Sequence, residues 1–277
     1  MLLLLFLVIV ITWADSFRLP TKMVFDSFGN SKIKGQILQL GAALDRGQAY
    51  NPTSGEYYKD RMDVAIQKVK ELISQSPVLP SSLDALDGEW ELVFSSVPHG
   101  IFRSSPFFLA IQEAYAKEGP EGADKAQLFF KLHELQTCSW GASKVGRVAQ
   151  YFNSTTGTMA SEFDTSIFSM TVIPVFGWFK LLPTFGGCVI TMSKVMLSEN
   201  RLEFEVDYTT SKAVKGLNGL GDFVFDKKVP VGPIWKLLPW NKGRPPTSYV
   251  ILKYLDEDFR IVEDRDGEYF VYTRPVA

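Results

Sequence analysis

The C-terminal stretch from Tyr254 to Val271 most constrains the fold, because it has the pattern of two strands joined by a polar turn. Phe259 and Ile261 alternate with charged residues, Arg265-Asp-Gly267 supplies a tight connection, and an apolar run resumes at Tyr269. A run that alternates in this way places one face in a core and the other in water. The chain is therefore expected to close with a pair of antiparallel strands.

Similar patterns recur through the second half of the chain. The clearest is Arg201–Tyr208, where Leu202, Phe204, Val206 and Tyr208 alternate with acidic residues. Further strands are expected at residues 88–94, 145–152, 159–172, 189–197, 248–254, 259–263 and 268–274. About eight successive antiparallel strands fit an up-and-down barrel that can enclose one small ligand.

Helical spacing of apolar residues interrupts this pattern in two places. Two helices are expected within residues 31–75, ahead of the first strand. A second helical stretch is expected within residues 106–137, between the first and second strands, as a helical insertion over one end of the barrel.

The first strand opens with Gly88-Glu-Trp90 and places Trp90, Leu92 and Phe94 on one face, and the last strand ends at Arg274. This arrangement resembles a lipocalin-type barrel. The fold class expected is therefore mainly β with helices (α+β), with a lipocalin-like antiparallel up-and-down β-barrel over residues 86–277. The resemblance also implies that Trp90 packs across the closed end of the barrel, in cation–π contact with Arg274.

The run Tyr254-Leu-Asp-Glu-Asp-Phe-Arg260-Ile, followed by Gly and then Phe-Val, is similar to the plastid lipid-associated proteins, the fibrillins of plastoglobules. The positions that carry the resemblance are Gly88, Trp90, Asp256, Asp258, Arg260, Gly267 and Phe270. We expect the Asp and Arg side chains to stabilise a turn rather than to touch a ligand. Family members often have a second Arg three positions after Arg260, where this chain has Glu263.

The resemblance implies a non-enzymatic protein that binds prenyl lipids, such as carotenoids or quinones, at plastoglobules or thylakoids. A barrel cavity is expected, lined by Phe94, Phe152, Phe204, Val206, Tyr208 and Tyr249. Two alternatives remain open: a structural lipid-droplet coat protein without an internal ligand, and a lipocalin-like lipid-modifying isomerase or cyclase.

The N-terminal residues have the pattern of a targeting leader. The apolar run Leu2–Ile11 is too short to span a bilayer of roughly 30 Å but is typical of a signal peptide. Residues 1–16 are expected to be a signal peptide and 17–30 a transit-like basic segment, followed by the domain at 31–277. Phe17 after the expected cleavage site resembles the bipartite leader of algae with secondary plastids. This implies transport to the plastid, with secretion as the alternative.

The net charge and the few histidines and cysteines limit the kinds of site that the chain can form. The formal net charge of -2 offers no basic excess for nucleic acid. His99 and His133 have no recognisable nucleophile partner, and with Cys138 and Cys188 they form no metal-binding pattern. No metal, cofactor or catalytic residue is therefore expected. Whether the two cysteines pair, and whether Asn153 is glycosylated, stays open.

The segments Ile173–Pro183 and Val229–Pro239 align as a repeat, sharing Pro, Val, Lys, Leu, Leu and Pro at matching positions. Their prolines and glycines place each copy in a connection between strands. Aromatic residues beside leucine and lysine suit a lipid interface, which predicts peripheral contact with a lipid monolayer or membrane. The residues expected to make it are Trp178, Phe179, Trp235 and Trp240. The alternative is that both loops fold back over the barrel mouth and pack on the helices.

Overall fold

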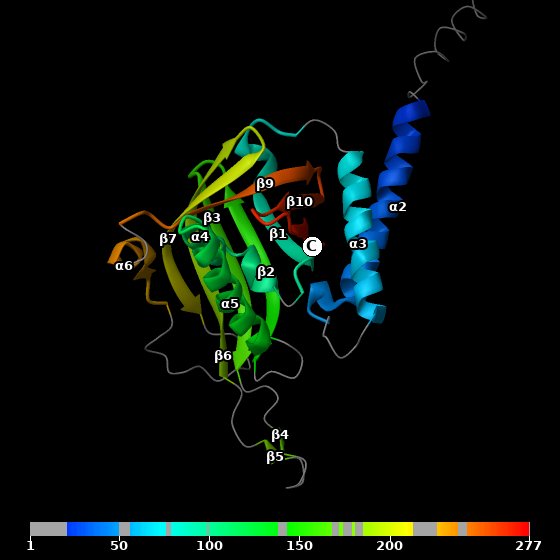
Figure 1. Ribbon diagram of the computed structural model, residues 1–277. Helices are drawn as coiled ribbons and strands as arrows, with labels where there is room; N and C mark the ends of the chain where they lie inside the picture. Colours follow the sequence, from blue (N-terminus) through cyan, green and yellow to red (C-terminus); the bar gives the residue numbers. More distant parts are fainter. Residues whose placement is uncertain are drawn as a thin grey trace, which may run out of the picture.

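A computed structural model describes residues 21–49, 56–75, 79–98, 100–137, 143–167, 172–173, 179–180, 185–212, 226–237 and 243–276. Its centre is a closed, eight-stranded antiparallel β-barrel (Figure 1). Some helices pack on the outside of the barrel, and others are inserted in the chain between two successive strands. The expected α+β, lipocalin-like fold class is confirmed.

The barrel strands are β1 (Gly88–Ser95), β2 (Ser143–Asn153), β3 (Thr158–Ile167), β6 (Phe185–Ser198), β7 (Arg201–Lys212), β9 (Thr247–Leu255), β10 (Phe259–Glu263) and β11 (Tyr269–Thr273). Each pairs with the next of these along the chain, and β1 pairs with β11 to close the ring. The barrel is therefore an up-and-down meander. A short strand, β8 (Val229–Pro230), is added to β7, and β4 (Val172–Ile173) pairs with β5 (Phe179–Lys180).

The two copies of the repeat lie between barrel strands, as expected. The first holds β5 and part of β4, between β3 and β6. The second forms β8 and the short helix α6 (Val231–Leu237), between β7 and β9.

Two helices precede the barrel and pack against each other on its outer side, α2 (Thr21–Ala43) and α3 (Glu56–Ser74) (Figure 1). Helix α2 begins at Thr21 rather than near Ser31, so it extends into the segment expected to be transit-like. Their apolar faces form one cluster with outward side chains of the barrel, including Phe94, Phe259, Ile261 and Val271. This part of the barrel is therefore buried on both faces.

The helical insertion follows β1 as the 3₁₀ turn η3 (Ile101–Ser104), α4 (Pro106–Ala116) and α5 (Pro120–Thr137). Ser105 is extended and Pro106 occupies the first helical turn of α4, where a missing N–H costs nothing. Gly119, at φ +82°, separates the two helices. Ile101 and Leu109 belong to the interior cluster of the barrel, so the insertion reaches into the barrel rather than merely covering it.

Several pairs of barrel strands contain register shifts, and two of these bulges change the facing of residues expected to line the cavity. One lies in β1 between Leu92 and Phe94, and the other in β7 between Val206 and Tyr208. A bulge adds one residue to one strand of a pair and shifts the alternation that follows. The prediction that Phe94 shares a face with Trp90 is wrong, because Trp90 and Leu92 lie in the interior cluster while Phe94 packs with α2 and α3.

Helix α2 approaches the first bulge closely at Gly41. A Cβ atom there would lie 2.4 Å from the carbonyl oxygen of Val93, a distance that no side chain can accept. Gly41 therefore lets α2 rest directly on β1, even though glycine weakens a helix interior.

Among the helices that the structure describes, none combines the length and apolar character needed to cross a membrane.

Candidate functional site

The barrel interior is almost filled by side chains. The void between Phe152, Phe204, Arg260 and Tyr272 has a volume of about 10 Å³, close to what one water molecule needs. In the part of the chain that the structure describes, the expected lipid cavity is therefore not found between these interior side chains.

The six residues expected to line that cavity are split between the two faces of the barrel. Phe152 and Phe204 belong to the interior cluster and border the small void. Val206 faces inward and packs with α4 and α6.

Phe94, Tyr208 and Tyr249 lie on the outer side, so their expected inward orientation is wrong. The two bulges turn Phe94 and Tyr208 outward. Tyr249 lies between the buried Ser248 and Val250 on β9, and Arg201 stacks on its ring at 3.8 Å.

Arg260 is the main polar group inside the barrel and is only 1% exposed. Its Nη2 donates a hydrogen bond of 2.5 Å to Oε1 of Gln150. Its guanidinium carbon lies 4.0 Å from the ring centre of Tyr272, 4.9 Å from Phe152 and 5.2 Å from Trp90. Burial lowers the pKa of Arg260 to about 10, so the group is still charged at neutral pH.

The surroundings of Arg260 compensate its charge only in part. Burying an ion costs several kcal/mol. A desolvated cation–π contact contributes up to about 2 kcal/mol of stabilisation, and a hydrogen bond to a charged group contributes about 1.5–3 kcal/mol. Nε and Nη1 of Arg260 are buried without a hydrogen-bond acceptor among the described residues. Each such buried donor costs about 1–3 kcal/mol.

Trp90 lies beside Arg260 and closes this end of the barrel core as expected. It is fully buried and its indole N–H donates to the carbonyl oxygen of Leu86 at 2.8 Å. The guanidinium carbon of Arg274 lies 4.2 Å from its ring centre, which confirms the expected contact. Arg274 also donates to the carbonyl oxygens of Asp87 and Glu257. Trp90 is therefore placed as a structural plug.

The acidic residues of the β9–β10 turn stabilise that turn and form ion pairs with helix α2. Oδ1 of Asp256 accepts hydrogen bonds from the amides of Asp258 and Phe259, and Lys34 of α2 pairs with both carboxylates. Burial alone would raise the pKa of Asp256, but hydrogen bonds from Lys34 and Tyr254 outweigh it and hold that pKa below its usual value.

The expectation that these residues stabilise a turn is thus met for the acids but not for Arg260. Arg260 points into the barrel instead, because its neighbours Phe259 and Ile261 face the outer helices and side chains alternate along a strand. The strand β10 is therefore buried on both faces. Among the other signature residues, Gly267 adopts φ +85° in the β10–β11 turn and Phe270 is fully buried in the interior cluster.

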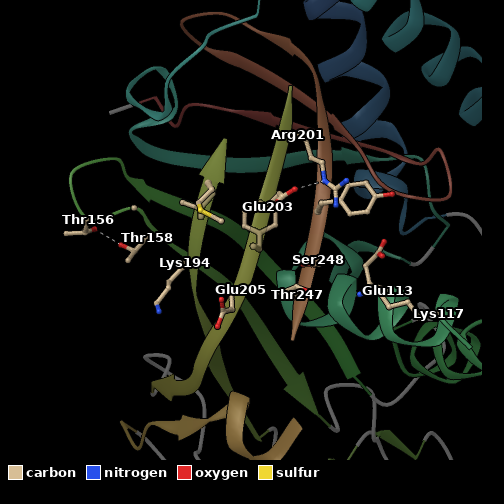
Figure 2. A pocket seen from close by; sticks show the side chains of 15 residues that line it. Glu113, Lys117, Thr156, Thr158, Lys194, Arg201, Glu203, Glu205, Thr247 and Ser248 are labelled. Atoms are coloured by element: carbon tan, nitrogen blue, oxygen red, sulfur yellow. Dashed lines mark hydrogen bonds and ion pairs between the residues drawn. The ribbon is translucent and has the colours of Figure 1, made fainter. Parts of the chain in front are cut away.

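A groove with a volume of about 610 Å³ is open and carries several charged side chains (Figure 2). It lies along β6, β7 and β9, with Glu113 from α4, Lys117 directly after that helix, and residues 156–158 between β2 and β3. Its charged side chains are Glu113, Lys117, Lys194, Arg201, Glu203 and Glu205. The two signs are balanced, and the Nε atom of Arg201 is already paired with Glu203 at 3.0 Å. Such charged side chains make the groove less suited to an apolar lipid than an uncharged pocket.

A second pocket, of about 300 Å³, is almost wholly apolar. It lies between the helical insertion, the end of β7 and the β8–α6 segment. Its lining is Phe107, Ile111 and Tyr115 from α4, Phe129 from α5, Thr209 from β7, Val229 from β8, and Val231, Ile234 and Trp235 from α6. Concave, aromatic-rich lining of this size is typical of sites for apolar small molecules.

The sequence did not predict this pocket as a site, although two signals mark it. The aromatic stripe of α4 supplies one wall, and the second copy of the repeat supplies the other. The ring of Trp235 packs edge-on against Phe107, with ring centres 5.9 Å apart.

The prediction of membrane contact is wrong for Trp235. That side chain is 5% exposed, because the second copy of the repeat folds back onto α4. This was the alternative for that loop. Trp178, Trp240 and the side chain of Phe179 lie outside the described residues.

The chain around β8 and α6, which forms one wall of the apolar pocket, carries both apolar and basic exposed side chains. Val229 and Ile234 are 47% and 50% exposed. Lys227, Lys228 and Lys236 are also exposed on the same segment. A lipid surface favours this combination, with lysines at the headgroups and apolar side chains below them.

The remaining candidate groups give no sign of reactivity where they can be described. His99 and Cys138 lie outside the described residues, as does the side chain of His133. Cys188 is buried, and burial together with Glu162 raises the pKa of its thiol to about 12. Within the described part of the chain, no group of three or more His, Cys, Asp or Glu side chains could hold a metal ion.

No family model matches the chain, and no characterised protein or solved structure gave a match.

Proposed function

We propose that the protein binds an apolar lipid in the pocket between α4, α5 and the β8–α6 segment while it sits on a lipid surface. By its motif resemblance to the fibrillins, the lipid is a prenyl lipid such as a carotenoid or quinone, and the surface is that of plastoglobules or thylakoids. The barrel acts as the rigid support on which the helical insertion and α6 form the site.

The observation that carries the proposal is the chemistry of the pocket lining. Of its nine residues only Thr209 and Tyr115 carry a hydroxyl, and none is charged. The void in the barrel interior is too small for a lipid, and the groove carries six charged side chains. Burial of apolar ligand surface stabilises a complex by roughly 25 cal/mol per Å² before the costs of association.

The filled interior favours one alternative, a coat protein that covers lipid droplets without holding an individual lipid. The two functions differ in stoichiometry. A lipid-binding protein retains about one lipid per chain after it is removed from the surface, whereas a coat protein retains none.

The experiment uses the full chain incubated with droplets that contain carotenoid and quinone. The protein is then repurified and extracted with organic solvent, and the lipid is quantified by mass spectrometry. We expect a stoichiometric lipid from the wild type and loss of it from Ile234→Lys, which places a charge in the lining.

Val64→Lys is the matched control, because Val64 is 45% exposed on α3 and does not line the pocket. It should keep the lipid, and both variants should keep the wild-type melting temperature, since both side chains are exposed. Wild-type protein that carries no lipid would sink the proposal in favour of the coat protein. Equal lipid in Ile234→Lys and the wild type would move the site elsewhere.

A further inference from the structure

The connection between β2 and β3 begins with the triplet Asn153-Ser154-Thr155, which has the pattern of an acceptor for N-linked sugar. Such a triplet is an acceptor only when the residue after the asparagine is not proline. The sequence has one other Asn-x-Ser/Thr triplet, at Asn51, and Pro52 rules it out. Asn153 is therefore the one position at which the sequence allows this modification.

The fold exposes the two residues that define the triplet. The side chains of Asn153 and Thr155 are exposed, whereas the middle residue, Ser154, is anchored. The Ser154 hydroxyl donates to Oδ2 of Asp87 at 2.6 Å, and its backbone amide donates to Oδ1 of the same carboxylate at 2.5 Å. These bonds fix the turn to the residue before β1 without using either side chain that sugar transfer requires.

The turn also leaves the reacting atom of Asn153 accessible. The amide of Gly157, at φ +61°, donates to the carbonyl oxygen of Ser154 at 3.2 Å and closes a tight turn. Oδ1 of Asn153 accepts from the amide of Thr156 at 3.0 Å, so the turn uses the side-chain oxygen. The side-chain nitrogen, Nδ2, donates to no described residue.

We propose that Asn153 carries an N-linked oligosaccharide. The donor is an oligosaccharide on a polyprenyl diphosphate carrier in the endoplasmic reticulum. Nδ2 of Asn153 forms a bond to C1 of the first sugar, and the bond between C1 and the diphosphate oxygen breaks. The carrier leaves as its diphosphate with the electron pair of that bond, and the amide loses one proton.

The proposal rests on the expectation that residues 1–16 are a signal peptide, because the donor is used inside the endoplasmic reticulum. It does not rest on lipid binding, since the turn shares no lining residue with the apolar pocket.

A sugar chain at this turn has a consequence for the neighbouring groove. Thr156, Gly157 and Thr158 border that groove (Figure 2), so the sugar stands beside it. A bulky, strongly hydrated sugar does not enter hydrocarbon. This side of the barrel therefore stays in water when the protein sits on a lipid surface.

The first test asks whether the modification occurs. The full chain, including residues 1–16, is made in insect cells, and its gel mobility is compared before and after treatment with peptide N-glycosidase F. We expect one step to higher mobility, and mass spectrometry of the treated protein should find aspartate at position 153. A wild type whose mobility does not change overturns the proposal.

Variants locate the modification. Asn153→Gln and Thr155→Ala should each lose the mobility step, whereas Thr155→Ser should keep it, because serine also completes the triplet. A step that survives in Asn153→Gln would place the sugar elsewhere and overturn the assignment.

A second version of the protein separates the acceptor from the leader. In this version an established signal peptide replaces residues 1–16. If it is secreted without sugar, the exposed triplet is not an acceptor. If it alone is modified, the chain's own leader does not bring Asn153 to the donor. Either result overturns the proposal, and neither bears on lipid retention.

Discussion

The contact between Trp90 and Arg274 can be measured as a coupling free energy. The variants are Trp90→Leu, which removes the aromatic face and keeps an apolar side chain, and Arg274→Met, which keeps the aliphatic stem. We expect the coupling energy to be about 1 kcal/mol. Cation–π contacts range from about 0.5 to 2 kcal/mol, and this pair joins a fully buried ring to a half-buried cation.

The single variants should differ in their cost. Trp90→Leu loses buried ring volume and the hydrogen bond to Leu86, so we expect a loss of about 3 kcal/mol. Arg274→Met loses two hydrogen bonds to backbone carbonyls in a half-exposed position, which should cost about 1–2 kcal/mol.

The assay is urea unfolding followed by far-ultraviolet circular dichroism, since tryptophan fluorescence changes with the mutation itself. The coupling energy is the free energy of unfolding lost in the two single variants together, minus the loss in the double variant. A coupling below about 0.3 kcal/mol, within the usual error of additivity, would refute the interaction. Arg260→Met in place of Arg274→Met tests the second cation in the same way.

Three further predictions follow from the packing and the charges. Phe94→Ala and Phe204→Ala should each reduce the free energy of unfolding by about 3–5 kcal/mol without changing lipid retention, because both lie in packed clusters; a Phe204→Ala variant that folds normally but loses lipid would restore the interior site. Gly41→Ala should lower the melting temperature, since its Cβ would meet the Val93 carbonyl at 2.4 Å, whereas Gly35→Ala, with open space around it, should not; equal melting temperatures would show that α2 does not rest on β1. The pKa of Asp256 lies below its unfolded value of about 3.9, so its pairing stabilises the fold above that pH and is lost as the pH falls towards the folded pKa. In this acidic range the urea midpoint of the wild type should fall with pH, and Lys34→Met should make that fall less steep. The same pH dependence of the urea midpoint in both proteins would contradict the pairing.

The strands and helices were largely predictable because their signals are local. Alternation along Arg201–Tyr208 and helical spacing in residues 106–137 each follow from neighbours in the sequence. The cation–π contact of Trp90 was predictable only through the resemblance to lipocalins, because Arg274 lies far from Trp90 in the sequence.

The orientation of individual side chains was less predictable. The bulges near Val93 and Asp207 involve ordinary residues and leave no sequence signal, yet each turns one aromatic side chain to the other face. The alternation of β10 was also ambiguous. Phe259 and Ile261 face the outer helices, and Arg260 faces the interior, because α2 and α3 bury the outside of the strand.

The apolar pocket could not be predicted from the sequence because its walls come from four separate parts of the chain. The repeat pointed to the β8–α6 segment, but its partner α4 is set by the tertiary fold.

Photocrosslinking can show whether an apolar lipid binds between α4, α5 and α6. A lipid analogue with a photoreactive group on its apolar chain is bound to the wild-type protein and irradiated, and the modified residues are mapped by mass spectrometry. We expect crosslinks to the pocket lining, chiefly Ile111, Phe129, Val229 and Ile234. Crosslinks confined to interior residues such as Phe152 and Phe204 would contradict this expectation and would show that the barrel opens to take the lipid inside.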